Sequence, residues 1–421
     1  MKPDPYTVPA FSAKGAAQPA LRRKITLPLL VLYGLGVTIG AGIYVLIGAT
    51  AERAGIFAPT SFLVAAFVML FSACSFGELS GRFPQSAGEA VYVEAGFRSP
   101  TLTVLTGGLL LLAAIISSAA ISVGSAGYIA TLVALPDWAI IILIIGFTGG
   151  LASWGIVESV AFAAVLTLIE ILGLVAVVIA GLWAQPDILL RLPEVIAPPT
   201  DAGVLLSVSI GSLLAFFAFI GFDGMVNIIE ETKEPARNMP LGILLTLLIA
   251  TLLYFAVSSV AVLALPIEEL STSSAPLSLL FQRLTGISPV AITLIASVAT
   301  LNGVVVQAIL ASRVVYGLAK VGRLPGFLAQ LNPRTRTPIL ATVLVSAFTL
   351  VFALFFPIGI LAERSTQIVL VVFLLINASL LRIKWRREPA PENIFVVPFV
   401  VPLIGFVTCL LMLGVPVFLQ F

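Results

Sequence analysis

GVTIGAGIY, residues 36–44, puts three glycines near the middle of the first long apolar segment of the chain. A second interruption, FAFIGFDG at residues 217–224, lies near the middle of a later apolar segment. Glycine weakens a helix, and non-helical backbone inside a bilayer persists only where protein buries it or where it lines a cavity. A matched pair of such breaks, one in each half of a chain, is typical of the binding site of a secondary transporter.

The composition excludes a soluble protein. Of the 421 residues, 60% are hydrophobic and 10% are charged, whereas a soluble domain carries about 25% charged residues. The chain has no histidine, so any proton chemistry would use Asp, Glu, Lys or Tyr. Its two cysteines, Cys74 and Cys409, lie in separate apolar segments without metal-ligand spacing. We therefore expect an integral membrane protein with no metal, no cofactor and no nucleic-acid partner.

The apolar segments predict eleven transmembrane helices, because a span needs about 20 apolar residues. They are expected at residues 27–50, 57–81, 101–133, 138–155, 157–183, 204–229, 240–265, 288–317, 339–357, 365–383 and 399–420. With the N-terminus in the cytoplasm, 18 of the 22 Lys and Arg residues fall on the cytoplasmic side and 4 fall outside. Residues 1–24 are expected to form a disordered cytoplasmic tail, and residues 394–421 either one span or a hairpin.

The breaks fall in spans one and six. Because five is an odd number of spans, the helices from span six onward cross the membrane in the opposite direction to those from span one onward. Residues 25–183 then form a first repeat with helices 1–5, and residues 204–383 a second repeat with helices 6–10. Residues 394–421 provide an extra helix outside the repeat. The sequence thus predicts an all-α polytopic membrane protein with a five-plus-five inverted repeat and broken helices 1 and 6.

Several motifs are similar to those of the amino acid–polyamine–organocation (APC) superfamily permeases, in their bacterial-type amino acid transporter branch. They are GxxIGAGI at residues 36–43, FGEL and RFP within 76–84, FAFIGFD with the charged loop that follows it within 217–240, and the SR, GRLP and TP pieces of 312–338. The resemblance extends over residues 25–340. It implies the leucine-transporter fold and secondary transport of amino acids or related amines.

The two breaks provide the expected substrate site. A helix that stops and restarts exposes N–H groups that suit a carboxylate and C=O groups that suit an ammonium or another cation. Packing between small residues at four-residue spacing is the alternative explanation of the first break alone. The candidate binding residues at the breaks are Thr38, Ile39, Gly40, Ala41, Gly42, Phe216, Phe217, Ala218, Phe219 and Gly221.

The resemblance adds further candidates to this site. It implies that Ser118 and Gln307 line the pocket, with interhelical hydrogen bonding as the alternative. It also implies an aromatic gate at Phe217, with ordinary core packing as the alternative. Asn302 is a further polar residue of the eighth span whose role stays open.

Glu170 and Asp223 are the candidate coupling residues. Glu170 lies at the centre of the fifth span, where a charged carboxylate costs about 2.5–3.5 kcal/mol. It is interpreted as the coupling proton site, with a permanently protonated, hydrogen-bonding Glu as the alternative. Many proton-coupled relatives carry Lys at the matching position, so proton, sodium or a cationic amine stay open as occupants, and a proton is preferred over sodium. Asp223 is interpreted as the N-cap of the restarted half-helix, with a titrating carboxylate as the alternative.

The charges beside the two broken helices suggest a latch. Residues 22–24 precede the first span with three cations, and residues 230–237 follow the sixth with mixed charges. Ion pairs between them would hold the cytoplasmic ends together, although such charges are more often solvated.

The sequence therefore predicts a secondary transporter of amino acids in the plasma (inner) membrane, proton-coupled and working by alternating access. An amine or polyamine carrier and an uncoupled amino acid exchanger are the alternatives. A channel has no need of paired broken helices, and an intramembrane enzyme would need a cluster of catalytic groups. The particular substrate and the oligomeric state are left open.

Overall fold

The computed structural model describes residues 23–85, 88–154, 160–196, 201–320 and 322–418. The predicted N-terminal tail lies outside the described residues, except for residues 23 and 24. In chain order the elements are α1 (Leu27–Ala41), α2 (Ile43–Ala54), η1 (Gly55–Phe57), α3 (Ala58–Arg82), α4 (Gly88–Phe97), α5 (Pro100–Ala130), α6 (Asp137–Trp154), α7 (Val160–Ala184), α8 (Ile188–Ile196), α9 (Ala202–Phe217), η2 (Phe222–Glu231), α10 (Pro235–Ala264), α11 (Ile267–Thr272), α12 (Pro276–Thr285), α13 (Val290–Lys320), η3 (Gly326–Ala329), α14 (Ile339–Phe355), α15 (Ile358–Trp385) and α16 (Val400–Phe418).

Over the described residues these elements make the eleven predicted spans. α1 and α2 together form broken helix 1, and α9 and η2 together form broken helix 6. The other predicted spans correspond to the long apolar helices α3, α5, α6, α7, α10, α13 and α15 and to the shorter apolar helices α14 and α16. The C-terminal segment contributes one helix, α16, rather than a hairpin. The chain is an all-α polytopic membrane protein.

The packing of the helices repeats between the two halves of the chain. In the first half, α1 packs on α7, so helix 1 contacts helix 5. In the second half, α9 packs on α15, so helix 6 contacts helix 10 in the same way. α1 packs on α10 as α9 packs on α3, and α5 packs on α14 as α13 packs on α6. A two-fold relation between five-helix halves requires such matched pairs, so the fold is the five-plus-five inverted repeat.

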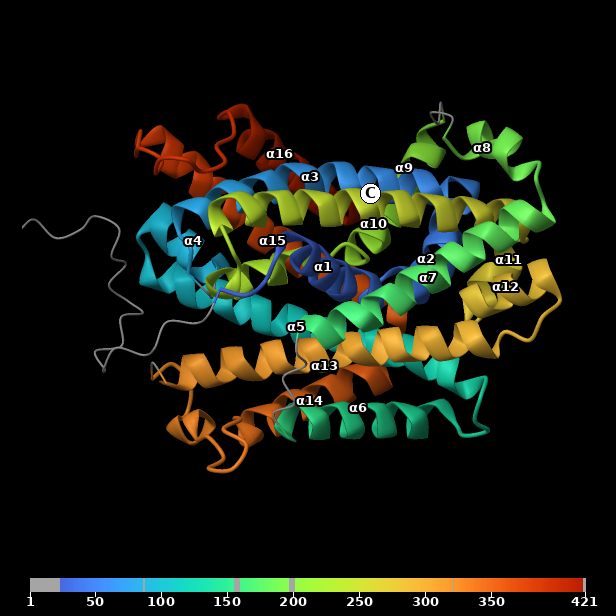
Figure 1. Ribbon diagram of the computed structural model, residues 1–421, viewed down its shortest axis with the longest axis horizontal. Helices are drawn as coiled ribbons and strands as arrows, with labels where there is room; N and C mark the ends of the chain where they lie inside the picture. Colours follow the sequence, from blue (N-terminus) through green and yellow to red (C-terminus); the bar gives the residue numbers. More distant parts are fainter. Residues whose placement is uncertain (1–22, 86–87, 155–159, 197–200, 321, 419–421) are drawn as a thin grey trace, which may run out of the picture.

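Both broken helices lie inside the bundle. In Figure 1, α1 lies in the middle of the molecule, with α10 and α3 on one side and α13 on the other. The apolar side chains of helix 1 are buried accordingly, as for Leu30, Ile39 and Ile43 with no exposed surface. The breaks are therefore screened from lipid by the other spans, as irregular backbone at membrane depth requires.

The two ends of the bundle differ. We call the end at which α3, α13 and α15 finish the basic end, because Arg82, Lys320 and Lys384 lie there; α4 and the start of α1 lie at this end in Figure 1. The short helices α8, α11 and α12 cover the opposite end.

A buried charge cluster fastens the segment before α16 to the basic end. Glu78 of α3 has no exposed surface, and its carboxylate accepts hydrogen bonds from Arg82 (Nε, 2.9 Å) and Lys384 (Nζ, 2.9 Å). It also accepts from the backbone N–H of Val397 at 2.8 Å. Lys384 in turn donates to the C=O of Val397. One carboxylate thus joins α3, α15 and the approach to α16.

We expect Glu78→Ala to destabilise the protein by about 3–5 kcal/mol, because it leaves two buried cations without their carboxylate. Thermal unfolding in detergent measures this loss. Glu388→Gln is the control, since Glu388 pairs at the surface with Arg98 and such pairs contribute about 0–1 kcal/mol. Equal melting temperatures for the two variants would contradict a structural role for Glu78.

Candidate functional site

The first break separates α1 from α2 at Gly42. The N–H of Gly42 turns back to the C=O of Ile39 at 3.2 Å, and the C=O of Gly42 accepts from Leu46 at 2.9 Å, which starts the new helix. The N–H groups of Ile43 and Tyr44, in the first turn of α2, have no acceptor within their own helix. Ala41 is the last residue of α1. The break thus provides N–H groups and a helix N-terminus at the centre of the bundle, as the sequence predicts.

The second break lies between α9 and η2. α9 ends at Phe217, and Ala218 and Phe219 form a tight turn with N–H bonds to the carbonyls of Ala215 and Phe216. Gly221 has φ +138°, a conformation that only glycine adopts without strain. The helix restarts as a 3₁₀ helix, and 3₁₀ stretches inside a span often mark a functional hinge.

The two breaks touch each other. A Cβ atom at Gly42 would collide with the backbone and side chain of Ala218, and one at Gly221 would lie 2.9 Å from the carbonyl carbon of Val37. Gly40 is packed as closely against α13, where its Cβ would lie 2.8 Å from the C=O of Ala299. The glycines are therefore required for close approach of backbone to backbone.

Tyrosine hydroxyls bond the carbonyls around the breaks. The hydroxyl of Tyr254 in α10 donates towards the C=O of Thr38 (3.1 Å) and the C=O of Ala218 (2.9 Å), and so joins broken helices 1 and 6. The hydroxyl of Tyr44 donates to the C=O of Glu170, and that of Tyr128 to the C=O of Tyr44. The C=O groups of Thr38 and Ala218 lie at the breaks, where helical partners are missing, and the hydroxyl of Tyr254 bonds both of them. The C=O groups of Glu170 and Tyr44 lie inside α7 and α2, so their bonds to tyrosine join neighbouring helices.

Glu170 of α7 lies beside the first break. Its side chain is 1% exposed, and its Oε2 lies 3.8 Å from the position that a Cβ on Gly40 would take. The C=O of Ala299 touches the same glycine. The structure thus brings the predicted coupling residue to the predicted substrate site.

The structure corrects the favoured interpretation of Asp223. Gly221, and not Asp223, is the N-cap of η2. Asp223 lies in the first turn, and its Oδ1 accepts a hydrogen bond from the N–H of Gly221 at 2.8 Å, two residues back. The cap prediction was wrong because the helix restarts two residues earlier, as a 3₁₀ helix. The carboxylate instead holds the glycine in its unusual conformation.

Ser118 and Gln307 lie at one level of the bundle. Gly40 of helix 1 and Ile121 of α5 both lie next to Gly303 of α13. Ser118 precedes Ile121 by three residues and Gln307 follows Gly303 by four, so both lie one helical turn nearer the basic end. Both are buried, at 1% and 8% exposure.

Two polar atoms next to the breaks have no hydrogen-bond partner among the described residues. They are Oγ1 of Thr38 and Oδ1 of Asn302, both in buried side chains. A bound polar ligand is one way to satisfy such atoms.

Aromatic rings pack together on the side of the breaks that faces the basic end. Phe373 of α15 contacts Phe76, Phe216 and Phe222 with ring centroids 5.2–6.0 Å apart, and Phe76 also contacts Tyr92 of α4. Phe219 instead packs on Tyr254. Phe217, the predicted gate, is fully buried. We call the rings of Phe76, Tyr92, Phe216, Phe222 and Phe373 the aromatic layer.

Beyond this layer, backbone bonds join the two broken helices. Lys24 and Ile25 donate their N–H groups to the C=O of Glu231, and Lys233 donates to the C=O of Ile25. Ile25 and Thr232 thereby form a parallel β-bridge. These main-chain bonds join the two segments between which the sequence suggests a latch, and the latch itself stays a prediction.

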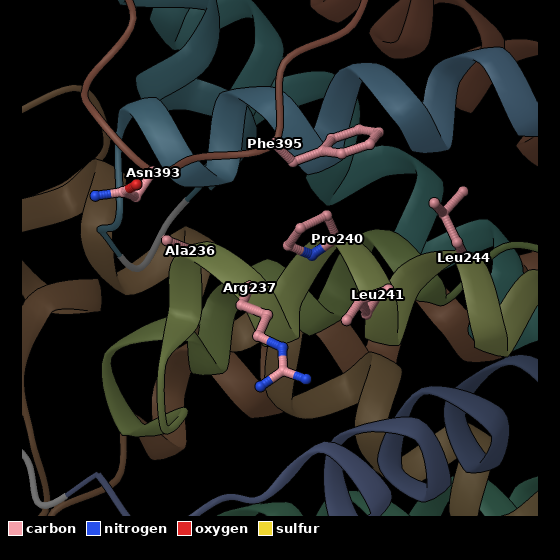
Figure 2. A pocket seen from close by; sticks show the side chains of 7 residues that line it. All are labelled: Ala236, Arg237, Pro240, Leu241, Leu244, Asn393 and Phe395. Carbon is pink, nitrogen blue, oxygen red and sulfur yellow. The ribbon is translucent and has the colours of Figure 1, made fainter.

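Two cavities lie away from the breaks. The larger, of about 510 Å³, lies at the opposite end and reaches Val45 and Gly124 from a rim that includes Glu52, Arg53 and Asp137. The other, of about 260 Å³, lies at the basic end between α10 and the segment before α16, and Figure 2 shows its lining residues. Since it contains no residue of either break, it is not the substrate site.

A family model described as "Amino acid permease" matches residues 27–420. The chain belongs to this family. The permease is 30% identical to the mitochondrial cationic amino acid transporter 3 of Arabidopsis thaliana, over 88% of this chain and 63% of that protein. It is 27% identical to the branched-chain amino acid permease BcaP of Bacillus subtilis, over 95% and 90% of the two chains, and 30% identical to the methylthioribose transporter of the same species, over 93% and 88%.

The permease thus spans about three fifths of the plant relative and most of the two bacterial ones. It is a multi-pass membrane protein of the APC superfamily, and the relatives that it matches are named as transporters and permeases.

We expect Gly42→Ala to abolish transport, because the added methyl group would push the two breaks apart. Uptake into proteoliposomes measures the effect. Gly146→Ala in α6 is the matched control, since a Cβ there meets nothing within 4 Å. Normal uptake by Gly42→Ala would mean that the breaks need not touch.

Tyr254→Phe keeps the ring and removes the hydroxyl that bridges the breaks. We expect a net loss of about 0.5–1.5 kcal/mol in stability and a larger fall in transport rate, because two carbonyls at the site lose their donor. Melting temperature and initial uptake rates measure the two effects. Tyr316→Phe on α13 is the control, and an unchanged rate for Tyr254→Phe would contradict the bridging role.

Proposed function

We propose that this permease is a secondary active transporter of amino acids that is driven by protons and works by alternating access. The contact between the two helix breaks, with Glu170 next to it, carries this proposal. It puts a helix N-terminus, freed backbone groups and a buried carboxylate together at mid-depth in the membrane, where the site of such transporters lies.

The substrate's carboxylate would bind the N–H groups that open α2, where the helix dipole favours negative charge. Its amine would face Glu170 and the polar atoms of Thr38 and Asn302. Its side chain would lie among the buried phenylalanines of the second break. Relatives named for cationic and for branched-chain amino acids support an amino acid as substrate.

Glu170 would carry the coupling proton. Its burial beside Gly40 makes its charge costly unless a cation or a proton accompanies it. α7 packs against helix 1 where Thr167 contacts Gly36. Loss and gain of a proton at Glu170 would alter this packing. Sodium at the same place is the less favoured occupant.

The asymmetry between the ends supports alternating access. The 510 Å³ cavity leads towards the site from the opposite end, whereas the aromatic layer and the β-bridge close the basic end. Basic residues gather on the cytoplasmic side of membrane proteins. We therefore assign the basic end to the cytoplasm of the cell, with the site accessible from outside first, in the plasma membrane.

An amine or polyamine carrier is the alternative, and the acidic Glu170 at the site favours it. An uncoupled exchanger is a further alternative that differs only in its driving force.

The test uses purified protein in liposomes with a panel of cationic, branched-chain and other amino acids, with amines and polyamines, under imposed proton or sodium gradients. We expect proton-driven accumulation of an amino acid. Uptake or exchange of no amine-bearing solute would overturn the transport proposal, and uptake of amines alone would favour the alternative.

Glu170→Gln separates coupling from binding. We expect this variant to lose accumulation driven by a pH gradient while it retains exchange of labelled for unlabelled substrate, because glutamine stays neutral. Glu268→Gln, on the surface of the opposite end, is the control. Full proton-driven accumulation by Glu170→Gln would exclude Glu170 as the coupling site.

A further inference from the structure

The short helix α4 connects the basic end to broken helix 6. At its first residue, a Cβ on Gly88 would lie 2.5 Å from Cγ2 of Val226 in η2. At its other end, Gly96 lies against Ser379 of α15 with no room for a side chain. α4 therefore packs on α15 and contacts η2 at Val226, so η2 cannot move past Gly88 while α4 stays in place.

Two carboxylates lie next to this contact. Glu89 follows Gly88 and is 5% exposed, although its helix lies near the end of the bundle. Residues three apart lie above one another in a 3₁₀ helix, so Asp223 shares the face of η2 that Val226 presents to Gly88. Tyr92, one turn after Glu89, packs on Phe76, which packs on Phe222 next to Asp223. The aromatic layer thus holds the two carboxylates on facing elements.

The electrostatic surroundings of Glu89 agree with this geometry. Burial raises the pKa of Glu89 most, and the negative charge of Asp223 raises it further, from its ordinary 4.5 to about 8. A hydrogen bond from the backbone N–H of Glu89 itself lowers this pKa by a smaller amount. Burial and Glu89 likewise raise the pKa of Tyr92. Two carboxyl groups that interact so closely titrate as a pair.

The nearby cations bond other partners. Arg82 and Lys384 bind Glu78, and Arg386 pairs with Glu388 and donates to the C=O of Ala95. The guanidinium of Arg382 lies over the ring of Phe97, at the far end of α4. Of the elements around α4, η2 has Asp223 in its first turn and Glu230 and Glu231 at its C-terminal end. α5 has no Asp, Glu, Lys or Arg.

We infer that Glu89 and Asp223 hold one proton between them, and that this proton keeps α4 against η2 and closes the basic end of the permease. Loss of the proton leaves two negative charges in a buried contact, which separates the two elements and admits water. The inference rests on the proposed proton-driven transport and adds to it a second proton site, at the gate.

Opening and proton release are then one event. Water that enters the contact lowers the pKa of Glu89 towards its ordinary value, so the proton leaves on the side to which the gate opens. The sign follows from linkage. A carboxyl whose pKa is raised in the closed state stabilises that state at low pH, and this stabilisation is lost as the pH rises from about 4.5 through about 8.

The test measures the opening of the gate directly. Val226→Cys is introduced in full-length protein with Cys74→Ser and Cys409→Ser, and its reaction rate with a maleimide is followed from pH about 6.5 to about 9. The exposed reference Gln330→Cys corrects for ionisation of the thiol. We expect the corrected rate to rise roughly tenfold or more, as the pair loses its proton.

Three variants assign the effect. Glu89→Gln keeps the contact neutral and is expected to abolish the corrected rise, whereas Glu94→Gln, also buried on α4, is expected to leave it unchanged. Asp223→Asn keeps an acceptor for the N–H of Gly221 and removes the charge, so the rise is expected at a lower pH. An unchanged rise in Glu89→Gln, or a flat profile in the parent protein, would overturn the inference.

A second measurement guards against a reporter cysteine that disturbs folding. Without any reporter, the melting temperature of the unmodified protein is expected to fall from pH about 6 to about 9 more steeply than that of Glu89→Gln. Parallel profiles would overturn the inference. A Glu89-dependent gate in a protein that fails proton-driven uptake would support the pair and contradict the proposed transport instead.

Discussion

The constraint on which this structure depends is that backbone groups inside a bilayer must be bonded or buried. Two helices stop at mid-depth, at Gly42 and Gly221, and each stop frees N–H and C=O groups that water cannot reach. The fold responds by placing the two stops against each other in the interior and surrounding them with the other spans. A break that would be costly at the lipid surface therefore places directed polar groups at the centre of the bundle.

Side chains from distant helices complete that centre. Tyr254 bonds one carbonyl from each break, and Tyr44 and Tyr128 extend the chain of hydroxyl-to-carbonyl bonds along α2 to Glu170. Each such bond contributes little to stability by itself. Tyr254 joins α10 to helices 1 and 6, and Tyr44 and Tyr128 join α2 to α7 and α5.

The sequence predicted the spans, the repeat and the level of Glu170, because hydropathy, charge bias and glycine position are properties of a single segment. It did not reveal the roles of Tyr254, Phe373 or Glu89. The residues around each of them in the sequence do not indicate which distant side chain or carbonyl it contacts in the fold. Asp223 was misread because the restart as a 3₁₀ helix moves the cap to Gly221. The sequence suggested ion pairs between the charged segments beside the two broken helices, whereas the bonds seen between these segments join backbone groups of Ile25, Glu231 and Lys233, which side-chain charge does not predict.

The buried carboxylates of the permease differ in what surrounds them. This difference distinguishes a carboxylate that holds the structure together from one that can bind and release a proton. Glu78 has two cations and a backbone N–H around it, all of them bonded to its carboxylate, so it holds three parts of the chain together. Glu89 has burial and another carboxylate around it, which favour the protonated form near neutral pH. A proton that is held by desolvation rather than by a base leaves when water arrives. The same packing that closes the basic end therefore sets the condition for losing the proton, and no separate sensor is needed to couple the two.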